Sequence, residues 1–315
     1  MHTPPPARQP AQVITPFWGH KWPVWWKLLR PHTLTASFVP VAIGTALALP
    51  FRQVRLDLLA IMLLSSMLIQ IATNMFNEYY DYQRGLDHEF SLGIGGAIVR
   101  HGVASRHVLT AAQYTMAAAI LLGLYLCQET SWWLLPVGLS GTAAGYLYSG
   151  GPFPISATPF GELVSGIFMG LLMILISFFL QTGTISSIAM FGSIPTSVLI
   201  GAILLSNNLR DLEDDKEHGR RTLAILLQRT KATYCLIAMF VFSYVWMLLL
   251  IALKIFSVWS LLTFISIPKA VHASQIFLRN TTPESLAPAM VATAQTNTLF
   301  GFLLVLGLLI QYYLP

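Results

Sequence analysis

The chain has 315 residues, of which 55% are hydrophobic and only 10% are charged, with a formal net charge of +5. Soluble domains carry roughly 25% charged residues, so the composition excludes an ordinary soluble enzyme and indicates an integral membrane protein. The positive excess is small, and we expect no nucleic-acid partner. Cys127 and Cys235 both lie in apolar runs, which argues against a disulfide framework.

Two parts of unequal size are expected. Residues 1–29 form a polar, Pro-rich cytoplasmic tail and an interfacial segment around Trp22–Trp26, without the apolar core of a signal peptide. Residues 30–315 form a single all-α transmembrane domain, because apolar stretches of about 20 residues recur and each spans a bilayer as a helix. The nine predicted spans are 33–50, 57–78, 107–127, 132–149, 160–181, 189–208, 232–253, 257–277 and 291–313.

The Lys and Arg residues predict the orientation, since cytoplasmic loops of membrane proteins are enriched in them. With the N-terminus in the cytoplasm, only Arg52, Arg55 and Lys254 lie outside, and the other 15 of the 18 Lys and Arg residues lie inside. This places both acidic clusters described next on the cytoplasmic side of a cell membrane.

The first acidic cluster closes the second predicted span, where residues three or four apart share a helical face. That face carries Asn74, then Asn77 or Glu78, then Asp81. Gly85 is a plausible end of the helix and lets Asp87 turn back toward the same face.

A second cluster closes the sixth span, where Asn207, Asp211 and Asp215 recur every four residues. Carboxylates at the edge of a membrane helix are energetically costly and usually functional. The alternative is that both clusters are ordinary solvated loops, which does not explain why Asn precedes Asp by one helical turn in each.

Carboxylates and carboxamides are hard oxygen ligands, which suit Mg²⁺ bound together with substrate phosphates. The predicted metal ligands are Asn77, Asp81, Asp87, Asp211 and Asp215. The predicted diphosphate contacts are Asn74, Arg84, Arg100, Asn207 and Arg220, because guanidinium groups suit phosphate oxygens. For any one arginine, anchoring under the positive-inside rule explains its position equally well.

Two Gly- and Pro-rich cytoplasmic loops are less informative. The stretch Ser91–Arg100 follows no strand, so a dinucleotide fingerprint is rejected, and a phosphate lid and a plain connector remain open. Glu162 ends the second loop, 145–162, and is interpreted as either a helix N-terminal charge or a site residue. Tyr80, Tyr146 and Tyr148 pack at the interface or present ring faces to a carbocation in an acceptor or prenyl pocket.

At these motifs the sequence resembles the UbiA superfamily of intramembrane prenyltransferases, with Glu78 where many members have Asp. It is most similar to the branch acting on 1,4-dihydroxy-2-naphthoate in Gram-positive bacteria. The stretches that carry this second resemblance are Trp25–Lys27, Arg30–Thr35, Gly93–Arg100, Tyr148–Pro152 and Ala294–Thr298.

The resemblance implies about nine helices around a central cavity with a cytoplasmic cap and a side opening to membrane lipid. It also implies Mg²⁺-dependent transfer of a polyprenyl group from polyprenyl diphosphate to 1,4-dihydroxy-2-naphthoate, with loss of CO₂, giving demethylmenaquinone for menaquinone biosynthesis. Asp81, Asp87, Asp211 and Asp215 are its implied catalytic residues.

Rival interpretations remain at this stage. Another aromatic acceptor, such as 4-hydroxybenzoate, haem or a chlorophyll precursor, is compatible with the same diphosphate site. A cation transporter normally carries its acids near the bilayer centre, whereas these acids lie at helix ends. A scaffold protein would not need two facing sets of carboxylates. The prenyl chain length, the oligomeric state and the base that acts on the acceptor are left open.

Overall fold

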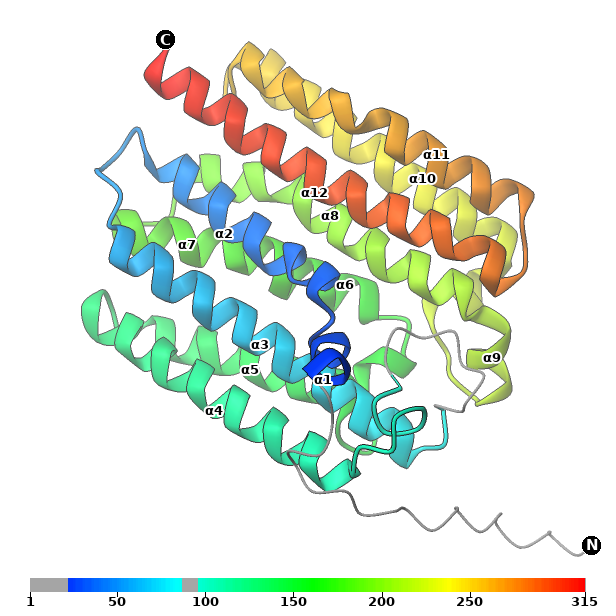
Figure 1. Ribbon diagram of the computed structural model, residues 1–315. Helices are drawn as coiled ribbons and strands as arrows, with labels where there is room; N and C mark the ends of the chain where they lie inside the picture. Colours follow the sequence, from blue (N-terminus) through cyan, green and yellow to red (C-terminus); the bar gives the residue numbers. More distant parts are fainter. Residues whose placement is uncertain (1–21, 87–95, 315) are drawn as a thin grey trace, which may run out of the picture.

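The computed structural model of the protein describes residues 22–86 and 96–314. Within these ranges all regular structure is helical, and long helices lie side by side in one bundle (Figure 1). The α-helices are α1 (Trp22–Leu29), α2 (Thr35–Ala48), α3 (Leu56–Gln83), α4 (Ser105–Glu129), α5 (Leu134–Ser149), α6 (Gly161–Ser165), α7 (Met173–Thr182), α8 (Ser187–Arg210), α9 (Leu212–Glu217), α10 (Leu223–Ala252), α11 (Ile267–Arg279) and α12 (Pro283–Tyr313). This confirms the predicted all-α class.

Seven helical runs in the described part of the chain are long and apolar enough to cross a bilayer. They are Leu56–Gln83, Ser105–Glu129, Gly161–Thr182, Ser187–Arg210, Leu223–Ala252, Val258–Arg279 and Pro283–Tyr313. The other two predicted spans correspond to α2, with 14 residues, and α5, with 16. At 1.5 Å per residue these helices extend about 21 and 24 Å, short of a hydrocarbon core of about 30 Å. The predicted count of nine is therefore not confirmed, although each predicted span coincides with helical structure.

Helix α3 ends as the sequence predicts. Gly85 has φ 70°, a conformation that glycine adopts without strain. The Gly85 N–H donates to the Tyr82 carbonyl (3.1 Å), and the Leu86 N–H donates to the Asp81 carbonyl (2.9 Å). This pair of bonds is a Schellman motif, which satisfies the last carbonyls of a helix. Asp81 is thereby fixed in the final turn of α3.

Helix α8 begins with a Ser186 cap, whose side chain accepts from the Ile188 N–H, and ends at Arg210. Asp211 connects it to the short helix α9, and the Asp215 N–H donates to the Asp211 carbonyl (2.8 Å). One helical turn therefore separates Asp211 from Asp215, as their spacing predicts. Helix α9 and the C-terminal end of α3 lie at the same end of the bundle (Figure 1).

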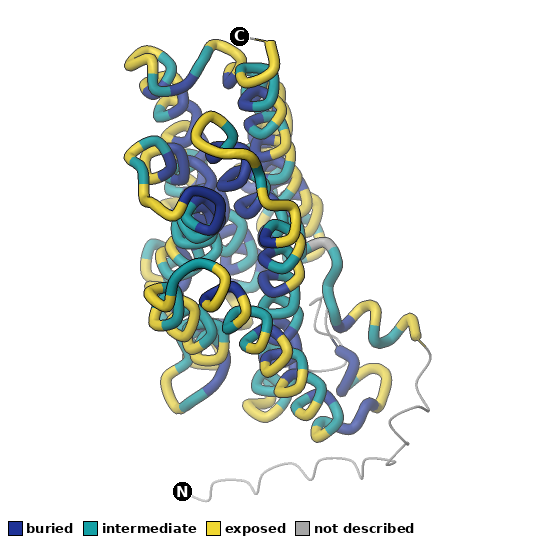
Figure 2. Tube along the Cα trace, turned by 90° about the vertical axis from the view of Figure 1, so that its left-hand side faces the viewer, coloured by how far each residue is buried: buried dark blue, intermediate teal, exposed yellow. Residues whose placement is uncertain are grey.

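The described interior holds a large apolar cluster of α2, α7, α8 and α10–α12, a smaller one around α3 and α4, and a third that joins α2, α3, α4 and α7. Buried residues line the inner sides of the helices, and exposed residues face outward (Figure 2). Small side chains let helices approach closely. A Cβ at Gly44 would collide with the Ile174 carbonyl, and Ser177 donates to the Val41 carbonyl (2.8 Å). Helices α2 and α7 therefore pack closely against each other in the large cluster.

Candidate active site

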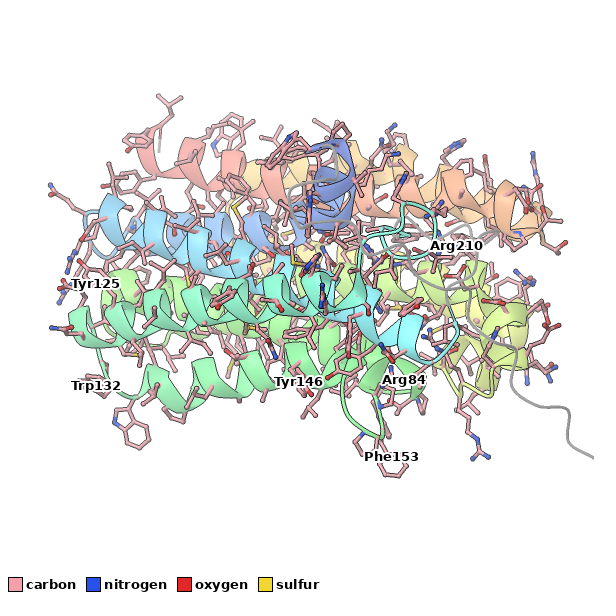
Figure 3. All side chains as sticks on the ribbon, turned by 60° about the horizontal axis from the view of Figure 1, so that its bottom comes forward. Arg84, Tyr125, Trp132, Tyr146, Phe153 and Arg210 are labelled. Carbon is pink, nitrogen blue, oxygen red and sulfur yellow. The ribbon has the colours of Figure 1, made fainter. Side chains whose placement is uncertain are left out.

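The face predicted for the end of α3 contains Asn77 and Asp81. The Asn77 Nδ2 donates to Asp81 Oδ2 (2.8 Å) and to Ser149 Oγ at the end of α5 (3.1 Å). Because the amide nitrogen makes both bonds, the carbonyl oxygen of Asn77 remains available as a ligand. Arg84 and Arg210 lie away from Tyr125 and Trp132 along the helices (Figure 3). The polar groups of the site thus lie toward one end of the bundle.

Arg220 brings the two acidic motifs together. It lies between α9 and α10, directly after Gly219, whose φ is 75°. Its Nη2 lies 3.0 Å from Asp81 Oδ1, and its Nη1 lies 3.0 Å from Asp215 Oδ1. One guanidinium therefore bridges carboxylates that are far apart in the sequence, and all three side chains are at least four-fifths buried.

Burial also affects the acidity of this site. The pKa of Asp215 is raised to about 6, chiefly because burial penalises the charged carboxylate, while the charge of Arg220 acts in the opposite direction. Nearby Asp211, Asp214 and Asp81 raise it further. The pair Asp81 and Asp215 is thus a site at which a cation relieves carboxylate repulsion.

The third described carboxylate, Asp211, has a different partner. Both its oxygens accept from Arg210, from Nε at 2.6 Å and from Nη2 at 2.5 Å. Its role as a metal ligand stays a prediction. Asp87, predicted as a further ligand, lies outside the described residues.

The predicted diphosphate residues occupy several environments. The Asn74 Nδ2 donates to the Leu29 carbonyl (3.1 Å) and to Thr33 Oγ1 (3.1 Å), which joins α3 to the segment after α1. The Asn207 carbonyl accepts from the Asp211 N–H (3.1 Å) and so holds the junction of α8 and α9. Neither side chain is shown facing the Arg220 bridge, and their binding roles stay predictions.

Two arginines of the predicted diphosphate site, Arg84 and Arg100, lie against loops. Arg84 donates from Nη2 to the Gly151 carbonyl (3.0 Å), and its guanidinium lies 5.5 Å from the centre of the Tyr80 ring. The Arg100 side chain folds back against Gly96, whose φ of 97° favours glycine.

A cavity of about 240 Å³ next to the bridge is lined by Arg84, Leu86, Pro152, Pro154, Ala157, His218, Gly219 and Arg220. Arg84 and Arg220 thus face one space that could receive an anion.

Two of the predicted pocket tyrosines pack against each other. The hydroxyls of Tyr80 and Tyr146 are 2.7 Å apart, and their rings meet edge to face with centroids 5.9 Å apart. Phe76 packs edge to face on Tyr146 at 5.3 Å. Tyr148 interacts electrostatically with Arg220, Asp81 and Asp215. Tyr80 directly precedes Asp81, and Tyr148 directly precedes Ser149, which accepts from Asn77. The role of the three tyrosines in an acceptor or prenyl pocket stays a prediction.

Two charged residues were absent from the predicted site. Glu78 is fully buried, and its carboxylate accepts from the N–H of Gly96 (2.7 and 2.9 Å) and of Ile98 (3.3 Å). Arg30, at φ 52°, brings Nη2 to 3.8 Å from Glu78 Oε2. Asn77, rather than Glu78, thus shares the face of Asp81. The sequence does show the glycine-rich loop that contains Gly96 and Ile98. It gives no sign that the backbone of this loop binds Glu78, because the two are about 20 residues apart.

The donor set fits Mg²⁺. No group of three or more His, Cys, Asp or Glu side chains gathers around a metal position in residues 22–86 and 96–314. Mg²⁺ often uses only one or two carboxylates, together with water and substrate phosphates. Asp81 and Asp215 already share the guanidinium cation of Arg220. The side chain of Asn77, which carries a further oxygen ligand, is bonded to Asp81.

A profile of the UbiA prenyltransferase family matches residues 37–304. The chain belongs to this family. The 1,4-dihydroxy-2-naphthoate octaprenyltransferase of Bacillus subtilis (strain 168) is 54% identical over 288 residues, which cover 91% of this chain and 93% of that protein. The enzyme of the same description from Escherichia coli (strain K12) is 28% identical, over 92% of this chain and 96% of its own. The predicted resemblance is confirmed.

A solved structure agrees with this assignment at the level of the fold. A UbiA homologue from Archaeoglobus fulgidus bound to DMAPP and Mg²⁺ superposes with a TM-score of 0.62 at 15% identity, over 90% of this chain and 99% of that one. The protein is a UbiA prenyltransferase, and the seven membrane-length helices in residues 22–86 and 96–314 indicate a multi-pass membrane enzyme.

Proposed function

We propose that this UbiA prenyltransferase transfers a polyprenyl group from polyprenyl diphosphate to 1,4-dihydroxy-2-naphthoate, with decarboxylation, to give demethylmenaquinone in its hydroquinone form, which is oxidised to the quinone in a separate reaction. The choice of acceptor is supported by the 54% identical relative from Bacillus subtilis. The observation that carries the chemistry is the bridge of Arg220 to Asp81 and Asp215. A site that holds two buried carboxylates and a guanidinium around one point suits a cation-bound diphosphate.

Asp81, Asp215 and the carbonyl oxygen of Asn77 would hold Mg²⁺, and Asp87 and Asp211 are proposed as further ligands. When bound, Mg²⁺ neutralises negative charge on the diphosphate oxygens. Arg84 and Arg220 face the cavity beside these acids and would bind the same oxygens. We propose Asn74, Arg100 and Asn207 as further contacts to the diphosphate.

The reaction itself is proposed as an electrophilic aromatic substitution. The C–O bond to the diphosphate breaks, and the leaving group takes the electron pair. The rings of Tyr80, Tyr146 and Tyr148 would face the resulting allylic cation, since an aromatic face attracts positive charge. The ring carbon bearing the carboxylate attacks the cation, and the bond to the carboxylate then breaks and releases CO₂.

We further propose that residues 30–315 form a single prenyltransferase domain with residues 1–29 as tail and interfacial segment. The family match over residues 37–304 supports this division. In the described part of that segment, Leu28 is buried while Trp22 and Trp26 are exposed. The Lys and Arg bias supports a plasma-membrane enzyme with its N-terminus and active site in the cytoplasm.

Purified protein should be incubated with a polyprenyl diphosphate and a panel of aromatic acceptors, with Mg²⁺ or with EDTA, and the products weighed by mass spectrometry. We expect product only from 1,4-dihydroxy-2-naphthoate and Mg²⁺, with a mass that shows loss of CO₂. Turnover of 4-hydroxybenzoate in place of the naphthoate would contradict the proposed acceptor. Mg²⁺ flux into proteoliposomes without prenyl transfer would support a transporter.

A further inference from the structure

One buried acid has no role in the Arg220 bridge to Asp81 and Asp215. Glu162, in the first turn of α6, has only 5% of its surface exposed. Its Oε1 accepts from Asn208 Nδ2 on α8 (2.9 Å). Its Oε2 is buried and has no hydrogen-bond partner among the described residues. A carboxylate at this depth is energetically costly when half of it is unpaired.

Packing alone does not explain this residue. A glutamine would accept the same hydrogen bond from Asn208 without burying a charge. Helix α6 also continues directly into a π-helical segment, Gly166–Leu172. Such widened turns are rare and are frequent at functional sites. The unpaired oxygen and the π-helical turn are two independent features that set this helix apart.

The segment between α5 and α6 connects Glu162 to the cavity beside the Arg220 bridge. Ala157 in this segment lines the cavity together with Arg220, and Gly161, which precedes Glu162, lies against the Ile155 carbonyl. The charges that act on the Tyr148 hydroxyl are those of Glu162, Arg220, Asp81 and Asp215. The next residue, Ser149, accepts from Asn77, so the end of α5 lies directly against the acidic face of α3. Glu162 therefore directly follows the segment that lines this cavity, and its charge also acts on Tyr148.

We propose that Glu162 accepts a proton from a hydroxyl of the aromatic acceptor, through Oε2, which has no hydrogen-bond partner in the part of the chain that the structure describes. This inference rests on the proposed function. As the ring carbon forms its bond to the prenyl cation, the neighbouring hydroxyl gives its proton to Glu162 and becomes a ketone. The ketone lies β to the carboxylate, so CO₂ leaves and its bonding electron pair forms an enolate. Glu162 returns the proton to the enolate oxygen, which restores the aromatic hydroxyl.

In this scheme no external base is consumed. The proton that Glu162 takes is the proton that it returns, and the released products are CO₂ and diphosphate. The bond from Asn208 holds Oε1 and leaves Oε2 unpaired among the described residues, and thus available to the acceptor. Asn208 is accordingly a positioning residue.

The test compares Glu162→Gln with Asn208→Ala in the purified, full-length enzyme. Glu162→Gln keeps the shape and the bond to Asn208 but cannot take a proton, so kcat should fall about 100-fold or more, the range of general acid–base catalysis. KM for polyprenyl diphosphate and the thermal midpoint should stay near wild type. Asn208→Ala keeps the carboxylate, so it should lower kcat far less than Glu162→Gln does.

A purely structural Glu162 gives the opposite pattern, with an active Glu162→Gln and a destabilised Asn208→Ala, and that pattern would overturn the proposal. If Glu162→Gln cannot be purified folded, Glu162→Asp decides the question. Its kcat should exceed that of Glu162→Ala, and equal rates would overturn the proposal. A wild-type enzyme that fails to prenylate the naphthoate rejects the proposed function instead, so the two failures are distinguishable.

Discussion

Arg220 and Asp81 lie 139 positions apart in the sequence, and Nη2 of the arginine is 3.0 Å from Oδ1 of the aspartate. This contact joins the end of α3 to the connection between α9 and α10. The same guanidinium reaches Asp215. The two acidic motifs therefore form one site, and the predictions below follow from that geometry.

The first prediction concerns the acids at the bridge. Asp81→Asn and Asp215→Asn should each lower prenyl transfer about 100-fold or more, because the amide removes a charge that a cation-bound diphosphate needs. Both variants should still fold, since the amide keeps the size of the side chain. Product formation and thermal unfolding in detergent measure the two properties. Glu213→Gln, at an exposed position on α9, is the matched control. Near-normal turnover by either aspartate variant would remove that residue from the site.

The second prediction concerns Arg220 and metal removal. In Arg220→Ala the buried carboxylates of Asp81 and Asp215 lose the guanidinium that bridges them, and breaking a buried ion pair typically costs about 3–5 kcal/mol. We expect the thermal midpoint in EDTA to fall well below wild type. Added Mg²⁺ should recover much of that loss, because it neutralises the same carboxylates. An equal midpoint with EDTA and with Mg²⁺ would show that the two acids do not bind the metal. Arg221→Ala is the control, because the Arg221 contact with the Ala157 carbonyl is made by the backbone N–H.

A third prediction follows from the pKa of Asp215, which burial raises to about 6. Mg²⁺ binds the deprotonated carboxylate, so affinity should be constant above pH 7 and should fall as the pH drops below about 6. The contribution of Asp215 to the stability of the metal-free protein depends on pH in the opposite direction to the Mg²⁺ affinity. A carboxyl whose folded pKa is raised binds protons more tightly in the folded state, so the metal-free protein loses this contribution as the pH rises through about 6. Mg²⁺ titration and thermal unfolding in EDTA from pH 5 to pH 8 measure both effects. Affinity that is unchanged down to pH 5 would contradict the assignment.

Local signals explain which parts of the fold were predictable. Apolar length located the nine predicted spans, each of which coincides with helical structure, and Gly85 marked the end of α3, because both depend on residues close in sequence. The count of nine spans was not confirmed because α2 and α5 are shorter than the apolar runs suggested. Hydropathy measures composition, whereas the hydrogen bonds decide where a helix ends.

The site residues likewise fall into pairs that local spacing predicts and contacts that depend on how the helices pack. Spacing placed Asn77 with Asp81 and Asp211 with Asp215, since each pair lies one helical turn apart. It did not show that Arg220 joins the pairs or that Arg210 holds Asp211, because those contacts depend on how α3, α8 and α9 pack. Glu162 was interpreted partly as a helix-end charge, and its partner Asn208 lies on another helix. Long-range pairing of this kind leaves no periodic signal in one sequence.

The last prediction concerns Glu78, whose carboxylate holds the turn from Gly96 to Val103. The Gly96 and Ile98 N–H groups donate to it, while Ala97, Ile98 and Val103 are buried against the helices around α3. A buried donor left without its acceptor costs about 1–3 kcal/mol.

Glu78→Ala should therefore loosen the turn that carries Arg100, without removing a group from the Arg220 bridge. Hydrogen exchange should increase at the amides of Gly96 and Ile98, and KM for polyprenyl diphosphate should rise more than kcat falls. Glu78→Asp keeps the charge but shortens its reach, so we expect an intermediate effect. If Glu78 instead bound metal directly, its loss would lower kcat as strongly as Asp81→Asn and leave exchange at Gly96 unchanged. Measuring both quantities on the same two variants separates a residue that positions the turn from one that takes part in the chemistry.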